Sequence, residues 1–295
     1  MKTPQQSYPE LAQFLGIPEM WLKREDLHPY GSHKGRSIPV MMKDYFKLEG
    51  LTSFVISSSG NAAIAAATAV KKHNQNNPQE KISLQIFVGK KIDAAKRKKL
   101  NHIAKDEDYI AIEEVENPKQ KAFQIDKEGK AKFLRQSTDD LALKGYVELA
   151  VELDKIPHLQ AIFIPTSSGT TAQALGQAFE TLTQKPQIHI VQTEACHPIA
   201  GVFDSSAPTT EFSIASAIVD KIAHRKEKVV EHIRASQGSG WIVSDDQIQN
   251  AKTLVQEKLK IDISFNSALS VAGLQKAIQQ GWKVDGAVVC LITGK

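Results

Sequence analysis

The sequence contains very little cysteine: Cys196 and Cys290 are the only two in 295 residues. Their separation fits no metal-ligand spacing, so the sequence predicts no metal site. A disulfide-stabilised secreted scaffold is excluded as well, because such chains are rich in cysteine. We expect both thiols to stay reduced and to pack in the core, in a reducing compartment such as the cytoplasm.

Long apolar runs are also missing. The longest, "AAIAAATAV", lies between Asn61 and Lys71 and is far too short to cross a bilayer. The first ten residues, "MKTPQQSYPE", lack the apolar core of a secretory signal. The net charge of +4 is too small to indicate a nucleic-acid partner, although it suits small anionic ligands. The basic run "KKIDAAKRKK" has no interleaved aromatic residues, so we expect it to form a solvated helix face.

Apolar, strand-like runs alternate with helical patterns along most of the chain. The strand-like runs are "SFVIS", "ISLQIFV", "YIAIEEV", "LQAIFIP", "QIHIVQT" and "GAVVCLITG". This alternation predicts an α/β fold with mostly parallel sheet. The stretch "DDLALKGYVELAVELD", residues 139–154, predicts a helix with a domain boundary near it. Because such sheets bind ligands at the carboxyl ends of their strands, the residues that follow each strand carry the most information about function.

The stretch "SSSGNAA", residues 57–63, follows the predicted strand "SFVI" and opens an alanine-rich helix. Its small residues let backbone N–H groups approach a ligand, and the N-terminus of a helix favours a carboxylate. The amide of Asn61 suits an aromatic hydroxyl or phenolate. Serine and asparagine are also preferred helix caps, and taken alone this stretch fits a capped helix better.

The stretch "PTSSGTTAQALG", residues 165–176, follows the predicted strand "LQAIFI". It supplies hydroxyl groups from Ser167, Ser168, Thr170 and Thr171, and Gly169 opens the backbone between them. So many hydroxyls at one helix N-terminus predict a phosphate site rather than a merely capped helix. The loop is neither a P-loop nor a dinucleotide-binding fingerprint, because both glycine spacings are absent.

The last strand-like run is followed by Thr293, in "LITGK". A hydroxyl at the carboxyl end of this strand is placed to hydrogen-bond a ring nitrogen. A Thr-Gly turn that simply ends the strand is an equally good interpretation of the same residues.

One lysine, Lys34, lies among small residues in "HPYGSHKGRS", just ahead of the apolar run "SIPVMM". A single lysine is ordinarily solvated. A buried lysine, however, has a lowered pKa and can form a Schiff base with a carbonyl cofactor. Gly31 and the apolar run that follows favour the second interpretation.

Four stretches together resemble, in order, the motifs of one enzyme superfamily. They are "WLKREDLHPYGSHKGRS", "SSSGNAAIAAA", "PTSSGTTAQALG" and "CLITGK". The superfamily comprises the fold-type II enzymes that use pyridoxal 5′-phosphate, also called the tryptophan synthase β superfamily. The similarity extends over nearly the whole chain, and it is closest to threonine synthase.

This resemblance implies a role for each matching residue. Lys34 would hold the cofactor as a Schiff base and later move protons at the α-carbon of the substrate. Asn61 would contact the 3′-oxygen of the cofactor, and Thr293 would meet its pyridine nitrogen. The phosphate would be bound by Ser167, Ser168, Gly169, Thr170 and Thr171. The substrate carboxylate would be bound by Ser58, Ser59, Gly60 and Asn61.

The resemblance also implies two doubly wound parallel-sheet domains with the cofactor cleft between them. The larger domain would contain residues 1–36 and 146–295 and bind the cofactor. The smaller domain, residues 37–145, would carry the loop for the substrate carboxylate. Members of the superfamily commonly pair, so a homodimer is expected.

The implied activity is that of a lyase that eliminates or replaces a group on the β- or γ-carbon of an amino acid. The stretch "SFNSALSVAGLQKA" is most similar to threonine synthase, which converts O-phosphohomoserine to threonine and phosphate. Gly35, however, stands where that family usually has an aspartate, and His33 is instead similar to the tryptophan synthase β subunit. A serine/threonine dehydratase on the same scaffold remains an alternative, as does a non-catalytic protein that binds a phosphorylated metabolite.

O-phosphohomoserine carries a phosphate of its own, which would need a second set of cationic or hydroxyl groups. Arg36, Lys23 and Arg24 are the candidates that lie near the lysine motif. An ion pair or a solvated position is the alternative for each of them.

Overall fold

The computed structural model describes residues 2–90, 92, 94–105, 107–205 and 207–294, and for Ala95 and Lys96 it describes the backbone alone. The last residue of "LITGK" and two residues of "KKIDAAKRKK" therefore lie outside the described part of the chain. The strands are β1 (Gln5–Ser7), β2 (Glu19–Arg24), β3 (Ser53–Ser57), β4 (Ser83–Gly89), β5 (Ile110–Val115), β6 (Lys132–Phe133), β7 (Leu159–Pro165), β8 (Gln187–Thr193), β9 (Gly240–Val243) and β10 (Ala287–Ile292).

The helices alternate with these strands. They are α1 (Pro9–Leu15), α2 (Lys34–Glu49), α3 (Asn61–Asn76), α4 (Ala94–Ala104), α5 (Pro118–Lys127), α6 (Leu141–Lys144), α7 (Val147–Leu153), α8 (Thr170–Phe179), α9 (Lys226–Ala235), α10 (Asp245–Leu259) and α11 (Phe265–Gln279), with short 3₁₀ helices η1 (Glu25–Leu27) and η2 (Ala200–Val202). No helix in the described ranges is long and apolar enough to span a membrane.

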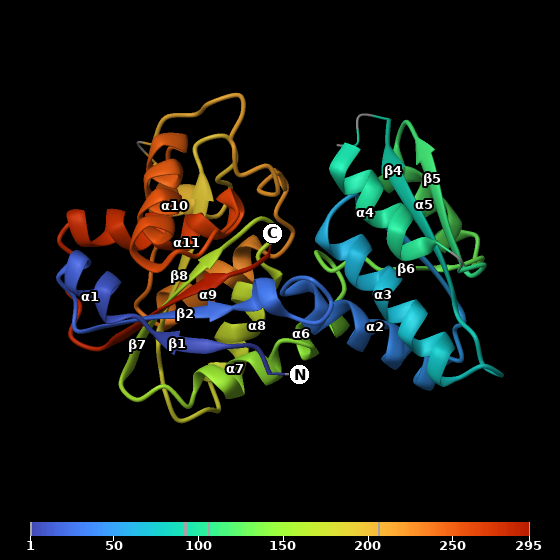
Figure 1. Ribbon diagram of the computed structural model, residues 1–295, viewed down its shortest axis with the longest axis horizontal. Helices are drawn as coiled ribbons and strands as arrows, with labels where there is room; N and C mark the ends of the chain where they lie inside the picture. The colour runs from blue at the N-terminus through green and yellow to red at the C-terminus, as the bar shows by residue number, and fades with distance from the viewer. Residues whose placement is uncertain (1, 91, 93, 106, 206, 295) are drawn as a thin grey trace. The chain divides into compact units, whose positions relative to one another are not determined.

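The chain forms two compact units. The larger contains residues 1–28 and 146–295, and the smaller contains residues 29–145. The family resemblance implies a change of unit after residue 36, whereas the compact units of the structure place residues 29–36, including Lys34, in the smaller unit. Each unit has its own sheet, and the α/β class predicted from the alternating pattern is confirmed (Figure 1).

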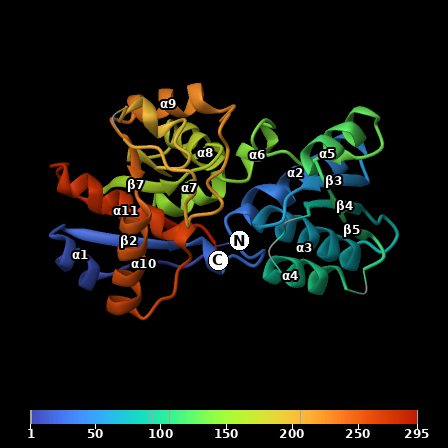
Figure 2. The same cartoon turned by 90° about the horizontal axis from the view of Figure 1, so that it is seen from above.

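The larger unit is built on a six-stranded sheet of order β1-β2-β10-β7-β8-β9. Only the β1–β2 pair, at the edge, is antiparallel. Helices cover both faces, with α7, α8 and α9 on one and α1, α10 and α11 on the other (Figure 2). Such two-sided burial explains why β10 is apolar along its whole length: each of its six residues is buried.

The smaller unit has a four-stranded parallel sheet of order β5-β4-β3-β6. Alternate residues of β3 face opposite cores: Phe54 and Ile56 pack with α2, α3 and α4, whereas Val55 packs with α5. The alanine-rich face of α3 is buried in the first of these cores. Small side chains there let the helices lie close to the sheet.

The predicted continuous helix over residues 139–154 is wrong. The structure has two short helices instead, α6 and α7, and the boundary between the two units falls between Gly145 and Tyr146. At Gly145 the chain lies directly against the start of α2: an added Cβ would be 2.2 Å from the carbonyl oxygen of Arg36 and 2.6 Å from Cα of Ser37. This close backbone approach requires glycine where α6 ends, and the pattern of apolar residues alone does not reveal it.

We predict that Gly145→Ala destabilises the smaller unit, because neither backbone atom that the new methyl group meets can move away alone. The expected loss is about 1–3 kcal/mol of unfolding free energy, as for other overpacked sites. Gly89→Ala is the matched control, since its Cβ would have only an ordinary contact at 4.0 Å with Pro118. Urea unfolding followed by circular dichroism measures both; equal midpoints for the two variants would contradict the prediction.

Candidate functional site

The lysine loop lies at the start of α2, in the smaller unit. Gly31 has a φ of +84°, a left-handed conformation that favours glycine, and an added Cβ there would be 3.5 Å from Ile64 in the first turn of α3. Ser32 is fully buried, and its hydroxyl accepts a hydrogen bond from the backbone N–H of Lys34 at 3.3 Å. The loop is therefore fixed against the helix that "SSSGNAA" opens.

The amine of Lys34 is electrostatically unusual. Burial removes water from its ammonium form and lowers its pKa from 10.5 to about 8. No carboxylate among the described residues forms an ion pair with it. Its place at the first residue of a helix acts in the same direction, because the helix N-terminus carries partial positive charge. Near neutral pH this amine is thus deprotonated far more often than an ordinary lysine.

We predict that, in the cofactor-free protein, the reaction of Lys34 with acetic anhydride speeds up with pH and reaches half its limiting rate near pH 8. The sign follows from the chemistry, because only the deprotonated amine is a nucleophile. Mass spectrometry of digested samples gives the rate for this residue alone. The denatured protein is the control, in which Lys34 should titrate at about 10.4 like a lysine in a peptide; a native midpoint of 10 or more would refute the assignment.

The loop Ser58-Ser59-Gly60 joins β3 to α3, and all of its residues and Asn61 are half-buried. Gly60 is the N-cap of α3, and no side chain caps the helix. Ser58 instead accepts from the backbone N–H of Gly60 at 3.2 Å, within the loop itself. The simple capped-helix interpretation therefore does not hold, and the helix N-terminus is not satisfied by a serine hydroxyl.

The second hydroxyl-rich loop, Thr166 to Thr171, joins β7 to α8 in the larger unit. Gly169, with a φ of +89°, is the N-cap of α8, and again no side chain caps the helix. An added Cβ at Gly169 would lie 2.7 Å from Val229 and 3.3 Å from Ile199. Glycine is thus required at this N-cap for both conformation and space.

A neighbouring segment holds this loop from outside. The backbone N–H groups of Val219 and Asp220 both donate to the hydroxyl of Ser167 at 3.2 Å. Beneath the loop, the amide of Gln192 donates to the carbonyl oxygen of Thr166 at 3.2 Å. Arg225 is buried beside Gly169, and its guanidinium donates to Gln173 on α8 at 2.9 Å. Sequence reasoning assigned none of these supporting contacts.

Thr293 follows β10, which lies between β2 and β7 and runs parallel to both. Its carboxyl end and that of β7 are therefore at the same edge of the sheet, about 4.8 Å apart across neighbouring strands. The side chain of Thr293 is buried, with 6% of the residue exposed. The structure thus brings Thr293 and the hydroxyl-rich loop together in the larger unit, while Lys34 and the Ser58–Asn61 loop are brought together in the smaller one.

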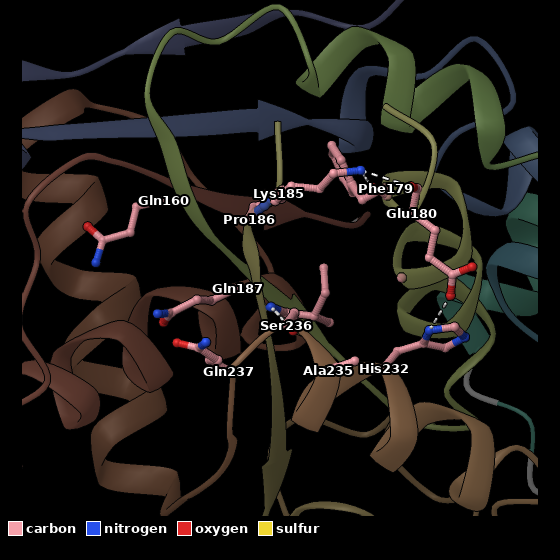
Figure 3. Close-up of a pocket in the computed structure, with 12 residues that line it drawn as sticks. Gln160, Phe179, Glu180, Lys185, Pro186, Gln187, His232, Ala235, Ser236 and Gln237 are labelled. Carbon is pink, nitrogen blue, oxygen red and sulfur yellow. Dashed lines mark hydrogen bonds and ion pairs between the residues drawn. The ribbon is translucent and has the colours of Figure 1, made fainter. Parts of the chain in front are cut away.

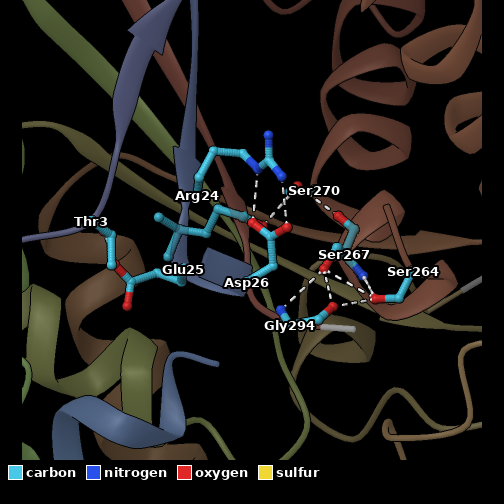
Figure 4. Close-up of polar contacts among 9 residues, drawn as sticks. Thr3, Arg24, Glu25, Asp26, Ser264, Ser267, Ser270 and Gly294 are labelled. Carbon is cyan, nitrogen blue, oxygen red and sulfur yellow. Dashed lines mark hydrogen bonds and ion pairs between the residues drawn. The ribbon is translucent and has the colours of Figure 1, made fainter. Parts of the chain in front are cut away.

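Lys23 and Arg24, which were considered for a substrate phosphate, each form an ion pair with a carboxylate. Lys23 is fully buried and bonds to Glu152, to the carbonyl oxygen of Thr3 at 2.9 Å and to Gln5 at 3.1 Å. Arg24 makes a two-bond contact with Asp26, each bond 2.8 Å long (Figure 4). These ion pairs support a structural role for both residues. Arg36 is 97% buried at the start of α2 (3% exposed), rather than solvated.

A cavity of about 420 Å³ lies elsewhere in the larger unit, at the amino ends of β7 and β8 (Figure 3). None of the predicted site residues lines it. Its polar lining is largely engaged already: Lys185 donates to the carbonyl oxygens of Phe179 and Glu180 at 2.8 Å, and Glu180 pairs with His232 at 3.3 Å. Because open parallel sheets bind ligands at the carboxyl ends of their strands, we place the functional site at the opposite edge.

Chemically, these donors suit an aldehyde-bearing, phosphorylated, aromatic cofactor. A lysine with a lowered pKa is matched to an aldehyde. A glycine turn at an uncapped helix N-terminus is matched to a phosphate, and a buried hydroxyl to a ring nitrogen. No cluster of three or more His, Cys, Asp or Glu side chains that could hold a metal occurs in the described ranges.

Comparison with known proteins agrees with this chemistry. The threonine synthase of Methanocaldococcus jannaschii is 27% identical over 99% of this chain and 74% of that protein. The biosynthetic L-threonine dehydratase of Haemophilus influenzae is 24% identical over 99% of this chain and 56% of its own length. A crystal structure of a pyridoxal 5′-phosphate-dependent aspartate racemase shares the fold, with a TM-score of 0.83, 19% identity, and coverage of 100% of this chain and 90% of that one.

The two units define a fold-type II enzyme. The family model for pyridoxal-phosphate dependent enzymes matches residues 1–294, and the chain belongs to this family. Its cofactor is pyridoxal 5′-phosphate, and its similarity to threonine synthases indicates a lyase. The expected superfamily, fold class and cofactor are confirmed.

Proposed function

We propose that this enzyme acts as a threonine synthase: O-phosphohomoserine would lose phosphate and gain water to give threonine. The observation that carries the proposal is the 27% identity to a threonine synthase over 99% of the chain. The altered environment of Lys34 supports it, since the reaction needs an amine that can both hold the cofactor and exchange protons. A non-catalytic phosphate-binding protein would have no need of such a lysine.

Lys34 is proposed as the catalytic residue. When bound, pyridoxal phosphate withdraws electrons from the α-carbon of the substrate and so makes its proton acidic. The Lys34 amine then takes up that proton, and its low pKa keeps it available as a base near neutral pH. The buried Ser32 hydroxyl, bonded to the backbone of Lys34, fixes the point from which this side chain extends.

The remaining loops are proposed to bind. The N-terminus of α8 with Ser167, Ser168, Gly169, Thr170 and Thr171 would hold the cofactor phosphate, and Thr293 would face the ring nitrogen. A neutral hydroxyl there does not force protonation of the ring, which suits elimination and replacement better than transamination. Ser58, Ser59, Gly60 and Asn61, at the uncapped N-terminus of α3, would bind the substrate carboxylate, with Asn61 also against the 3′-oxygen.

A serine/threonine dehydratase is the second candidate, and one specific observation favours it. Lys23 and Arg24 are committed to Glu152 and Asp26, so neither is available for a second phosphate without leaving a buried carboxylate unpaired. A dehydratase substrate has no phosphate and makes no such demand. The second relative, an L-threonine dehydratase at 24% identity, agrees with this alternative.

We predict threonine formation from O-phosphohomoserine, and a loss of roughly 10²–10⁴-fold in kcat for Lys34→Ala, as for removal of a general base. The visible absorbance band of the lysine-bound cofactor should disappear in the same variant. Lys43→Ala is the matched control, because this lysine is exposed on the same helix. Turnover of L-serine or L-threonine without any of O-phosphohomoserine would replace the first proposal by the dehydratase.

A homodimer in the cytoplasm completes the proposal. The two cysteines are buried and unpaired, which fits a reducing compartment. Pairing rests on the family resemblance, and sedimentation of the cofactor-loaded protein tests it directly: a particle of one chain, 32.5 kDa, would contradict it.

A further inference from the structure

In the larger unit, side chains of a helix bond to the backbone of Gly294, which follows Thr293 just after β10. Three serines lie on one face of α11 and at its N-cap, at positions i, i+3 and i+6: Ser264, Ser267 and Ser270. Ser267 and Ser270 are fully buried. All three direct their hydroxyls to backbone carbonyl oxygens near the end of β10: Ser264 and Ser267 to that of Gly294, and Ser270 to that of Leu291 (Figure 4).

Ser267 makes the decisive contacts. Its hydroxyl donates to the carbonyl oxygen of Gly294 at 2.8 Å and accepts from the N–H of the same residue at 3.2 Å. Ser264 also donates to that carbonyl oxygen, and it accepts from the backbone N–H of Ser267, so the clamp is tied to the start of α11. The N–H and the carbonyl oxygen of Gly294 are thus both bonded to Ser267, in addition to the β-bridge in which Gly294 takes part.

Thr293 is thereby fixed from both sides. Ile292, before it, is aligned with Arg24 of β2 in the sheet, and Gly294, after it, is held by Ser267. Holding both neighbours restricts the backbone from which the buried side chain of Thr293 extends.

We propose that Ser267 is a positioning residue for the cofactor ring: it fixes Gly294 so that the hydroxyl of Thr293 meets the ring nitrogen. This inference rests on the proposed role of Thr293. It differs from a purely structural role, in which Ser267 would stabilise the fold without affecting the bound cofactor. A hydroxyl that merely filled space in the core would not need to bond both backbone groups of one residue.

The test measures how tightly the enzyme binds pyridoxal phosphate, with the visible spectrum of the bound cofactor as a second readout. Ser267→Ala and Thr293→Ala should each weaken binding roughly fivefold, the effect of losing one ordinary hydrogen bond, and shift the band in the same direction. The double variant should bind no more weakly than either single one, because both changes remove the same contact.

Ser270→Ala is the matched control. This serine is equally buried on the same helix face, but its hydroxyl bonds to the carbonyl oxygens of Ser267 and Leu291, inside the strand. It should leave affinity and spectrum as in the wild type. Ser267→Cys serves if the alanine variant does not fold, because it keeps the volume and a weak donor; its effect should lie between wild type and alanine.

The outcomes separate this inference from the proposed function. If the wild type binds pyridoxal phosphate and Lys34→Ala loses the band, but Ser267→Ala matches the wild type, only the positioning role fails. It fails too if the effects of Ser267→Ala and Thr293→Ala add in the double variant, since Ser267 then acts independently of Thr293. If the wild type gives no lysine-dependent band, the proposed role of Lys34 is what fails.

Discussion

Parallel strands end at one edge of a sheet, and this constraint organises everything that the chain offers to a ligand. In the larger unit, β7 and β10 are neighbours, so the hydroxyl-rich loop and Thr293 come to the same edge although more than a hundred residues separate them. In the smaller unit, β3 delivers Ser58–Asn61 to the N-terminus of α3, against which the lysine loop packs through Gly31. The order and direction of the strands thus bring these polar residues to the same edge of each sheet, without any direct contact between them.

The loops at these edges share a second feature. Both α3 and α8 begin at a glycine, and neither N-terminus is capped by a side chain. By contrast, α10 and α11, which serve no predicted ligand, begin with Ser244 and Ser264, whose hydroxyls accept from the third residue of each helix. The cap costs a helix about 1 kcal/mol when it is missing. Helices α1, α2, α5 and α9 also lack a side-chain cap, so what distinguishes α3 and α8 is a glycine N-cap that follows a parallel strand rather than the missing cap itself.

The fold could be predicted from the sequence because the apolar pattern is unambiguous where strands are buried on both faces. The runs at residues 53–57, 159–165 and 187–193 are strands with the same bounds in the structure. The helix over residues 139–154 could not be predicted correctly, because the apolar pattern continues across the break between α6 and α7, and the close contact of Gly145 with Arg36 comes from a distant part of the chain. The bonds from Ser264 and Ser267 to Gly294 could not be predicted from the sequence either. The spacing of Ser264, Ser267 and Ser270 marks one helix face, but only the packing of α11 against β10 shows what that face touches.

Lys23 and Lys34 show why the identity of a residue does not determine its role. Both lie in the stretch "WLKREDLHPYGSHKGRS", and the sequence alone does not show which of them is paired with a carboxylate. Lys23 is fully buried and its three hydrogens are bonded to Glu152, Thr3 and Gln5, so its charge is compensated and its amine is blocked. Lys34 has lost water without gaining a carboxylate from the described residues, so its charged form is disfavoured and the pKa falls to about 8. A buried lysine whose charge is balanced by a carboxylate stabilises the fold. A buried lysine without such a partner has a lowered pKa, so its neutral amine can act as a base or nucleophile. The surrounding groups therefore decide the role of each lysine. A carboxylate placed beside Lys34 would raise its pKa towards the ordinary value, and the amine would then be protonated and unreactive near neutral pH.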